Sequence, residues 1–594
     1  MALRTRLTAL AGGGPALAVL PLLAFLGIFF LLPLLGVLWD SVSGPRLDLA
    51  PYARVFGDQI YLKVLRRTFE IGFNVTLLSI LFGYPVAYLL TVVGRRTATV
   101  MTLLVMVPLF TALLIRTYAW MIILGRRGII NDALIGLGLI DQPLDLLHTS
   151  IAVYIGMVHV LSPIAIFTMY SNMVQIDRRL VQAASVLGAD PVRGFLRVYL
   201  PMSLPGTIAA AVLVFVMSIG FYITPALLGG PADAMISQLI VAQTTALLNF
   251  ELGFALAMVL LAATLLTLAL AGFFIPLELL WTSERKLLPG GAGGAAQAAR
   301  RRVGALAGRL LLPLERGLAR LLRPVAPLLP ALLRLYGVAA MVFMAAPLLI
   351  VFILSFSSSE FLVFPPPGFS WQWYEKFMAA RDWHRALGFS IELALVTAVA
   401  AVLIGAAGAF GLVRARLPGR RFLFLLTLAP VIMPVIILAL ALYSFEARVR
   451  LLGSFPGLVI GHVVLALPYV VVVMTAAVRG LDPDLEHAAA VLGARPAQTL
   501  RRVLVPLLRP SLLTAGFFAF LVSFDELLIT LFLIGRQTQT LPLKFWADIK
   551  YQIDPLLSAA SSLIIAAIVL LILLGQWIRW RAERRSAPAA GAAT

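Results

Sequence analysis

Two adjacent carboxylates, Asp525 and Glu526, interrupt a long apolar stretch of the sequence. An ionised carboxylate in hydrocarbon costs on the order of 2.5–3.5 kcal/mol unless it faces protein or water, so acids within a membrane segment are functional candidates by default. Carboxylates on the path of a cation would lower the barrier to removing its water. The alternative is a structural ion pair, for which Arg116 is a candidate partner.

Aromatic side chains could add to such a path, because ammonium groups bind the faces of aromatic rings. The alternative is ordinary helix packing or an aromatic belt at the membrane surface. The candidates are Phe221, Tyr222, Tyr118 and Trp120.

The chain lacks the residues that most catalytic and metal sites require. There is no cysteine, which excludes disulfides and thiol catalysis. The five histidines show no spacing typical of a metal site. No G-x-x-x-x-G-K-[ST] sequence occurs, so the chain holds no standard P-loop. We therefore expect no enzyme activity, no metal site and no cofactor in this chain.

A second group of residues occurs twice with the same spacing. LVQAASVLGADPVRGFLRVYLP spans residues 180–201, and LEHAAAVLGARPAQTLRRVLVP spans 485–506. Each predicts a short Ala-rich helix, where small side chains let a partner approach closely, then a glycine at the left-handed position that ends a helix. The residues that we single out are Gln182, Ala183, Ala184, Gly188 and Pro201 in the first copy and Glu486, His487, Ala488, Ala489, Gly493 and Pro506 in the second.

The two copies differ where a second short helix begins. Asp190 can accept a hydrogen bond as N-cap, with Pro191 at the first helical position. The second copy has Arg495 before Pro496 and loses that cap. Each copy is thus predicted to form a helix-turn-helix that ends at Pro201 or Pro506.

Composition indicates that these residues are held by membrane-spanning helices. Hydrophobic residues make up 61% of the 594 residues and charged residues 12%, with a mean hydropathy of +0.99, against roughly 25% charged residues in soluble proteins. Runs of about 20 apolar residues predict spans. Twelve occur, near 16–39, 69–93, 100–124, 150–175, 207–229, 252–280, 327–354, 386–413, 421–446, 457–479, 511–534 and 558–580.

The distribution of charge predicts the orientation of these spans. Arg4 and Arg6 precede the first span, and Asp40, Asp48 and Asp58 follow it. Basic residues gather on the cytoplasmic side of membrane proteins, so the N-terminus is predicted inside, and twelve spans place both termini there. The same rule accounts for the net charge of +20 better than nucleic-acid binding does.

The two halves of the chain form an internal repeat. Pro163 and Pro468 are 305 residues apart, as are Gly188 and Gly493. Earlier in each half the offset is 322, as between Gly83 and Gly405. Both halves have six predicted spans and start inside, so the repeat is parallel, with a pathway expected between the halves.

The repeat sets the predicted domains, which are a first repeat at 1–281, a linker at 282–335, a second repeat at 336–581 whose first span begins near 327, and a disordered tail at 582–594. The linker is rich in Gly, Pro and Arg. Two interpretations of the linker are open. It could include a basic amphipathic segment that lies on the inner membrane surface, or it could be a simple tether.

The paired loops resemble the EAA motif of ABC importer permeases, E-A-A-x-x-x-G. The resemblance implies that these loops are coupling helices that dock on two separate ATPase subunits, which bind ATP and Mg²⁺. Gln182 and His487 occupy the Glu position of the motif, and Glu486 lies one residue earlier. An ion pair made by that Glu is therefore in doubt here, whereas docking by shape is not.

Other segments resemble the two permeases of spermidine/putrescine ABC transporters. In the first half these are GYPVAYLL (83–90), LIRTYAWMIILGRRGIIN (114–131) and GFYITPALLGGP (220–231). In the second they are the segments at 355–377 and 523–535 and TLPLKFW (540–546). The resemblance covers nearly all of both repeats.

This resemblance implies an all-α polytopic protein with the type I ABC importer permease fold, two permease subunits being fused in one chain. It implies a bacterial inner-membrane location, a periplasmic or lipid-anchored substrate-binding protein as partner, and polyamine import. Fused permeases for ferric iron, thiamine or aminophosphonate are alternatives. A twelve-span secondary transporter driven by an ion gradient is another, which the paired loops disfavour.

Overall fold

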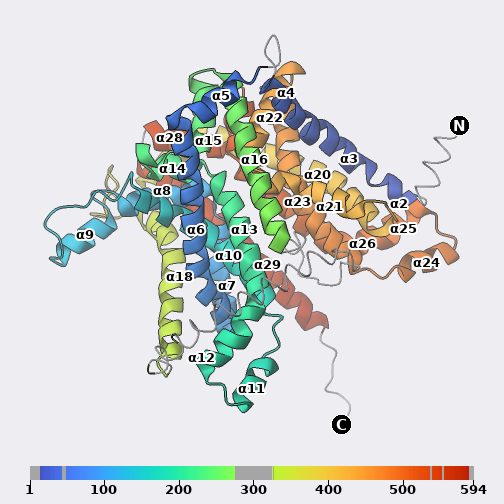
Figure 1. Ribbon diagram of the computed structural model, residues 1–594, viewed down its shortest axis with the longest axis horizontal. Coiled ribbons are helices and arrows are strands. Elements are labelled where there is room, and N and C mark those ends of the chain that lie inside the picture. Colours follow the sequence, from blue (N-terminus) through green and yellow to red (C-terminus); the bar gives the residue numbers. More distant parts are fainter. Residues whose placement is uncertain are drawn as a thin grey trace.

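The computed structural model describes residues 14–42, 48–274, 327–535, 538–551 and 554–586, together with Gly317 and Pro324. Helices are the regular structure throughout this part of the chain, with one isolated bridge between Ser357 and Phe369 (Figure 1). The predicted linker lies mostly outside the described residues.

The first half contains a broken first helix, the bundle helices and two short loop helices. These elements are α2 (Gly14–Leu17), α3 (Leu20–Leu26), η1 (Gly27–Leu31), α4 (Leu32–Asp40), α5 (Ala50–Gly57), α6 (Gln59–Val92), α7 (Arg95–Phe110), α8 (Leu113–Leu124), α9 (Ile129–Gly136), α10 (Ser150–Met173), α11 (Arg179–Val186), α12 (Pro191–Gly194), η2 (Phe195–Tyr199), α13 (Leu200–Ile219), α14 (Ile223–Leu228), η3 (Pro231–Asp233), α15 (Ile236–Val241), η4 (Ala242–Ala246) and α16 (Phe250–Phe274).

The second half repeats this order. Its elements are α18 (Leu329–Leu354), α19 (Gln372–Ala379), α20 (Arg381–Arg414), α21 (Arg420–Ile432), α22 (Val435–Arg448), α23 (Phe455–Arg479), α24 (Asp484–Val491), α25 (Pro496–Thr499), η7 (Leu500–Leu504), α26 (Val505–Phe524), α27 (Leu528–Leu533), α28 (Leu541–Tyr551) and α29 (Pro555–Ser586). Helices α6 and α20 each have 34 residues and correspond end to end at the offset of 322. The internal repeat seen in the sequence is thus a structural repeat.

Apolar helices dominate, but the number of spans differs from the prediction. In the described residues nine helices are long and apolar enough to cross a membrane, or eleven if each of two bent pairs is one span. Helix α29 contributes only a shorter apolar stretch, Pro555–Leu570. The count of twelve therefore stays a prediction.

The third predicted span of each half is a pair of helices with a sharp bend between them, and whether each pair crosses as one span stays a prediction. The axis turns by 99° between α7 and α8 and by 96° between α21 and α22. The breaks fall at Thr111 and Met433, which are both extended. Met433 precedes Pro434, and a residue before proline is disfavoured in the helical region.

The fifth predicted span of each half also ends early. Helix α13 stops at Ile219 and α26 at Phe524, whereas the apolar runs continue to 229 and 534. Each run then turns into a separate short helix, α14 or α27. The tail prediction is wrong for residues 582–586, which belong to α29, and residues 587–594 lie outside the described part.

The first helix of each half packs against the opposite half (Figure 1). Helices α3 and α4 lie on α20 and α22, where glycines allow close approach: a Cβ at Gly408 would lie 2.3 Å from Leu22, and one at Gly411 would lie 2.4 Å from Val19. An ion pair between Asp40 and Arg448 joins α4 to α22. In the same way α18 lies against α6, α7 and α8. The two halves are therefore interlocked rather than merely side by side.

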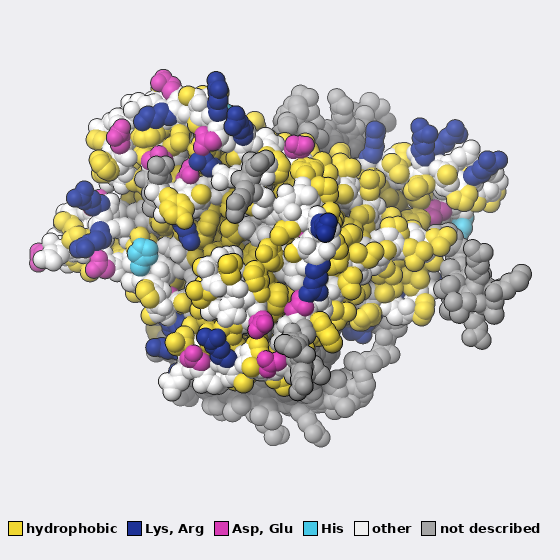
Figure 2. Space-filling view, turned by 90° about the horizontal axis from the view of Figure 1, so that it is seen from above, with side chains coloured by type: hydrophobic (Ala, Val, Ile, Leu, Met, Phe, Trp, Pro, Cys, Tyr) yellow, Lys and Arg dark blue, Asp and Glu magenta, His cyan; other side chains and the backbone are white. Residues whose placement is uncertain are grey.

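The outer surface fits a lipid environment. Large side chains on several helices are well exposed, among them Phe73 at 62%, Leu81 at 61% and Leu403 at 69%. Figure 2 shows hydrophobic side chains over much of one face, with charged side chains scattered among them. Such surface is unfavourable in water and favourable in hydrocarbon.

A polar cluster fixes the end of the first half that lies farthest from α11. Arg67 on α6 donates to Asp233 at 2.7 Å, and Ser150 at the start of α10 donates to the same carboxylate at 2.6 Å. Burial raises the pKa of Asp233, but the hydrogen bonds from Ser150, Arg67 and the Gly230 amide outweigh it, so the pKa lies below its usual value. The charged carboxylate therefore ties α6, α10 and η3 together.

Candidate functional site

The first of the paired loops forms the predicted helix-turn-helix. Helix α11 ends at Val186, and Gly188 follows with φ of +86°, the left-handed conformation that glycine adopts without strain. The Asp190 carboxylate then accepts a hydrogen bond from the Arg193 amide at 2.8 Å, which caps α12. Pro191 stands at the first position of that helix.

The second loop has the same path with a different cap. Gly493 has φ of +81° after α24. The arginine at 495 offers no acceptor for the helix that follows, as predicted, but the Gln498 side-chain oxygen accepts from the Arg495 amide at 2.8 Å. This bond from within α25 holds the Arg495 amide, which is a different donor from the Arg193 amide that Asp190 caps in the first loop.

Both loops join their next long helix through a turn of π-helix, η2 or η7. The turns precede Pro201 and Pro506, the second residues of α13 and α26. Proline has no amide hydrogen and its ring crowds the carbonyl four residues earlier, so the wider π turn accommodates it. The two prolines thus account for the π turn through which each loop joins its next long helix.

Each loop presents an exposed apolar pair at its tip. Val186 and Leu187 are 87% and 88% exposed, and Val491 and Leu492 are both 87% exposed. Gln182, Ala183, His487 and Ala488 are also exposed on α11 and α24. In Figure 1 the two loops occupy separate corners of the molecule. Matching apolar tips of this kind are typical of surfaces that a partner covers.

Glu486 does not face outward but toward the bundle. Its carboxylate lies 2.8 Å from the Arg414 guanidinium, with side chains only 25% and 13% exposed. Arg414 also donates to the Leu481 carbonyl at 3.0 Å. Sequence reasoning missed Arg414, although an arginine at the end of a long apolar helix is a possible signal. The second loop is thus tied to α20 by charge.

The first loop is tied down by aromatic rings instead. Tyr88 on α6 packs edge-on against Phe195 and Tyr199 of η2, with ring centroids 5.6 and 5.0 Å apart. Tyr84 shares a hydrogen bond with Ser203 at 2.7 Å. Sequence reasoning did not single out these residues. The two loops share a backbone path but are anchored by different chemistry.

Asp525 lies at the contact between the halves. It follows the last residue of α26, and its two carboxylate oxygens lie 3.2 and 3.3 Å from the amide of Leu113, which begins α8 in the other half. A carboxylate is favoured at a helix N-terminus. Arg116, the candidate partner in the ion-pair alternative, forms no salt bridge with Asp525 among the described residues, but its charge attracts that carboxylate. Its guanidinium donates to the Val160 carbonyl at 3.4 Å. A role for Asp525 in a pathway stays a prediction.

Glu526 points back into its own half. Its carboxylate accepts from the Ile529 amide at 2.9 Å and caps α27. Both acids remain partly exposed. His462 braces the turn that carries them, because its ring nitrogens lie 2.8 Å from Ser523 and 3.1 Å from Thr530. Sequence reasoning did not predict this histidine bridge.

The first half cannot carry an acid at the matching place. Gly220 corresponds to Asp525 at the offset of 305, and a Cβ there would lie 2.6 Å from the Pro434 ring. Any larger residue would separate the halves. The carboxylates are therefore confined to one side of the contact, as the sequence predicted.

The aromatic candidates are not brought together. Tyr118 is fully buried and shares a hydrogen bond with Ser558 at 3.2 Å. Trp120 packs against His159 and Phe343. Tyr222 packs against Trp546, with centroids 5.4 Å apart, and Phe221 is half-buried. The positions of Tyr118 and Trp120 fit the packing alternative.

The sequence matches one protein family twice. The family is described as "Binding-protein-dependent transport system inner membrane component", and it matches residues 77–276 and 401–587. These segments fall in the two structural repeats.

Two relatives from Escherichia coli strain K12 are similar to parts of the chain. The spermidine/putrescine transport system permease protein PotB is 30% identical over 277 residues, which are 45% of this chain and 97% of the relative. The putrescine transport system permease protein PotI is 32% identical over 251 residues, 41% of this chain and 89% of the relative. Each relative is thus about half as long as this chain.

A solved structure also aligns with part of the chain. It is a bacterial ABC transporter that imports the acidic polysaccharide alginate, with 16% identity and a TM-score of 0.34, and the alignment covers 44% of this chain and 97% of the other.

Proposed function

This chain belongs to the family of binding-protein-dependent transport system inner membrane components, and we propose on that premise that it is the permease of an ABC importer for polyamines. The observation that carries the proposal is the double family match in one chain, together with relatives named as spermidine/putrescine and putrescine permeases. One chain supplies both membrane halves, and membrane transport rather than catalysis is its role.

ATP hydrolysis is assigned to two separate ATPase subunits that bind ATP and Mg²⁺. The support is the pair of loops, whose apolar tips at Leu187 and Leu492 are almost fully exposed. Each tip would enter a cleft on one subunit. Burying one leucine contributes about 1.5–3 kcal/mol, so Leu187→Asp and Leu492→Asp should each release one subunit from the purified complex. Leu137→Asp, at an exposed leucine outside both loops, is the matched control.

The loops would then mark the cytoplasmic face of a bacterial inner membrane, with both termini on that side. A substrate-binding protein would deliver cargo to the opposite face, where Arg67 and Asp233 lie. Cysteine labelling can test this orientation, because the chain contains no cysteine of its own. A single cysteine at 187 should react only with reagents that enter the cell.

A cationic cargo is supported by the carboxylates at the contact between the halves. Asp525 and Glu526 are partly exposed, and neither forms a salt bridge within the described residues. A polyamine carries several ammonium groups that such carboxylates would attract. Ferric iron and thiamine are also cationic, so the preference for polyamine over them, and over aminophosphonate, comes from the names of the relatives.

The deciding experiment is initial uptake of labelled putrescine and spermidine in the native host, with and without this gene. We expect loss of polyamine uptake on deletion, sensitivity to ATP depletion and little effect of collapsing the proton gradient. Unchanged polyamine uptake with loss of ferric iron or thiamine uptake would refute the cargo. Uptake that follows the proton gradient alone would refute the importer class and favour a secondary transporter.

A further inference from the structure

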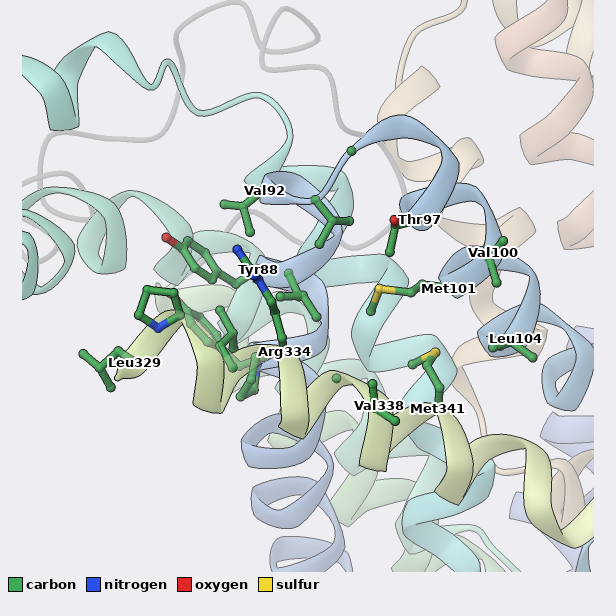
Figure 3. A pocket seen from close by; sticks show the side chains of 18 of the residues that line it. Tyr88, Val92, Thr97, Val100, Met101, Leu104, Leu329, Arg334, Val338 and Met341 are labelled. Carbon is green, nitrogen blue, oxygen red and sulfur yellow. The ribbon is translucent and has the colours of Figure 1, made fainter. Parts of the chain in front are cut away.

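A cavity of about 1340 Å³ opens between the two repeats, at the end of the molecule that carries the first coupling loop (Figure 3). Its walls come from the ends of α6 and α7, from α12 and η2, and from α18 of the second half. It exceeds the roughly 300–1,000 Å³ of sites for drug-sized ligands. A large ligand or a long chain is the kind of occupant that would fit it.

The lining is almost wholly apolar. Its polar side chains are Tyr84, Tyr88, Thr97 and Arg334, and Tyr84 is already bonded to Ser203. Ordered water needs two to four polar partners, so water is a poor occupant for the apolar depth of this cavity. The depth instead suits hydrocarbon.

The mouth is positively charged. Arg334 extends from α18 toward Tyr88 and Val92 at the end of α6 (Figure 3). It is exposed and has no hydrogen-bond or ion-pair partner among the described residues. Arg95 and Arg96 lie in the chain between the lining residues Gly94 and Thr97 and are exposed too. None of the described residues that line the cavity is acidic, so the positive mouth would repel the polyamine cargo.

The second half leaves only a smaller pocket at the corresponding corner, of about 600 Å³ and lined by residues 413–418 and Arg420. There Leu22 and Val19 press onto Gly408 and Gly411 of α20. At the offset of 322, the residues of α6 that match these glycines are Val86 and Leu89. A Cβ at Gly337 of α18 would meet Leu89 at 2.4 Å, so the helices touch at that level and leave space beyond it. The cavity is thus a consequence of particular residues in one half.

We propose that an anionic phospholipid of the cytoplasmic leaflet occupies this cavity, with acyl chains between α6, α7 and α18 and its phosphate beside Arg334. The inference rests on the orientation proposed above. The walls belong to membrane-spanning helices, so lipid is the solvent at the opening, and basic pockets between such helices on the cytoplasmic side bind anionic head groups. The charge of the mouth selects an anionic lipid over a neutral one.

The lipid would contact the base of one coupling loop only. One wall is formed by residues of α12 and η2, the elements after α11, namely Pro191, Val192, Phe195 and Leu196. A bound lipid would therefore support the first loop against α18 and leave the second, anchored by Arg414 and Glu486, unaffected. Anionic lipid would act on the two ATPase contacts unequally.

The test is lipid retention by the full chain, purified from nanodiscs that contain equal amounts of phosphatidylglycerol and phosphatidylethanolamine and analysed by native mass spectrometry. We expect wild-type protein to retain phosphatidylglycerol preferentially. Arg334→Gln should lower that preference about fivefold, the effect of one cation beside anionic lipid. Arg509→Gln, at an exposed arginine outside the cavity lining, is the matched control. Equal retention by wild type and Arg334→Gln would overturn the proposal.

A photoreactive residue in place of Val100 provides a second measurement that does not depend on removing a charge. Val100 lines the cavity and is 55% exposed. Cross-linking to phosphatidylglycerol is expected, whereas cross-linking to a peptide from residues 275–326 would show that the chain itself fills the site. Neither readout requires transport, so a wrong cargo would leave both results unchanged.

Discussion

Neutralising Glu486 should loosen the second coupling loop without touching the first. Its carboxylate and the Arg414 guanidinium are 2.8 Å apart and mostly enclosed. Glu486→Gln keeps the size of the side chain and removes its charge. Arg414 would keep its hydrogen bond to the Leu481 carbonyl, so the change is confined to the ion pair.

The expected magnitude follows from the geometry. At an effective dielectric constant of about 20, two charges at this distance attract by roughly 6 kcal/mol. Desolvation and ordering of the side chains cancel most of that: exposed pairs contribute about 0–1 kcal/mol, and breaking a buried pair costs about 3–5. For this mostly enclosed but still partly exposed pair we expect about 1–2 kcal/mol, which raises the detached population of the loop about 5- to 30-fold.

The assay is spin-label mobility in reconstituted protein. Because the chain has no cysteine, a single cysteine at Val491 carries the only label. Glu486→Gln should enlarge the mobile component of that spectrum, and so should Arg414→Gln. The double variant should add little to either single change, since both remove the same pair.

A label at Val186 in the first loop is the control, and its spectrum should not change. An unchanged spectrum at 491 would refute the view that the ion pair holds the loop. An equal change at 186 would show instead that the substitution disturbs the whole bundle.

Three further predictions concern the pathway, the turns and the distal cluster. Asp525→Asn should lower initial polyamine uptake about tenfold or more, a loss of at least 1.4 kcal/mol, at unchanged membrane abundance measured by immunoblot; wild-type uptake would remove Asp525 from the pathway. Gly188→Ala and Gly493→Ala should each lower the stability of their loop by about 1–2 kcal/mol and reduce transport. The cause is backbone strain alone, because both glycines have positive φ and an added Cβ would meet nothing within 4 Å. Equal transport in wild type and variants would contradict this strain. The pKa of Asp233 is lowered in the folded protein, so the stability that its charge contributes is complete above the usual aspartate pKa of 3.8. That stability is lost as the pH falls through the pKa of the folded protein. Hydrogen exchange at residues 229–236 should speed up in this pH range in wild type but not in Asp233→Asn.

Features that depend on local sequence were predictable. The helix-turn-helix loops follow from glycines and prolines at fixed spacing, and both glycines have the positive φ that the pattern requires. The repeat followed from constant offsets because its two copies carry no internal insertion between Pro163 and Gly230. The aspartate cap on α12 was predictable for the same reason, since an N-cap side chain bonds to amides only two or three residues away.

Features that depend on contacts between distant segments were not predictable. The runs at 100–124 and 421–446 are apolar throughout, so their composition cannot distinguish a straight span from one that turns by more than 90°. The pairing of Arg414 with Glu486 joins residues 72 positions apart that no motif connects. Arg116 was a reasonable partner for Asp525 by charge, but the backbone amide of Leu113 lies closer.

The exchange of first helices between the halves also bears on how the protein is made. Leu22 and Leu26 are fully buried in the finished molecule, yet the helix that covers Leu22 contains Gly408, synthesised roughly 390 residues later, some 20–80 s at about 5–20 residues/s. Throughout that interval the face of the N-terminal helix that carries Leu22 lacks the helix that covers it, although α16 of the same half, which contacts α4, is made earlier. The first half is therefore a folding intermediate when it leaves the ribosome, and it completes its packing only after the second half of the chain has been synthesised.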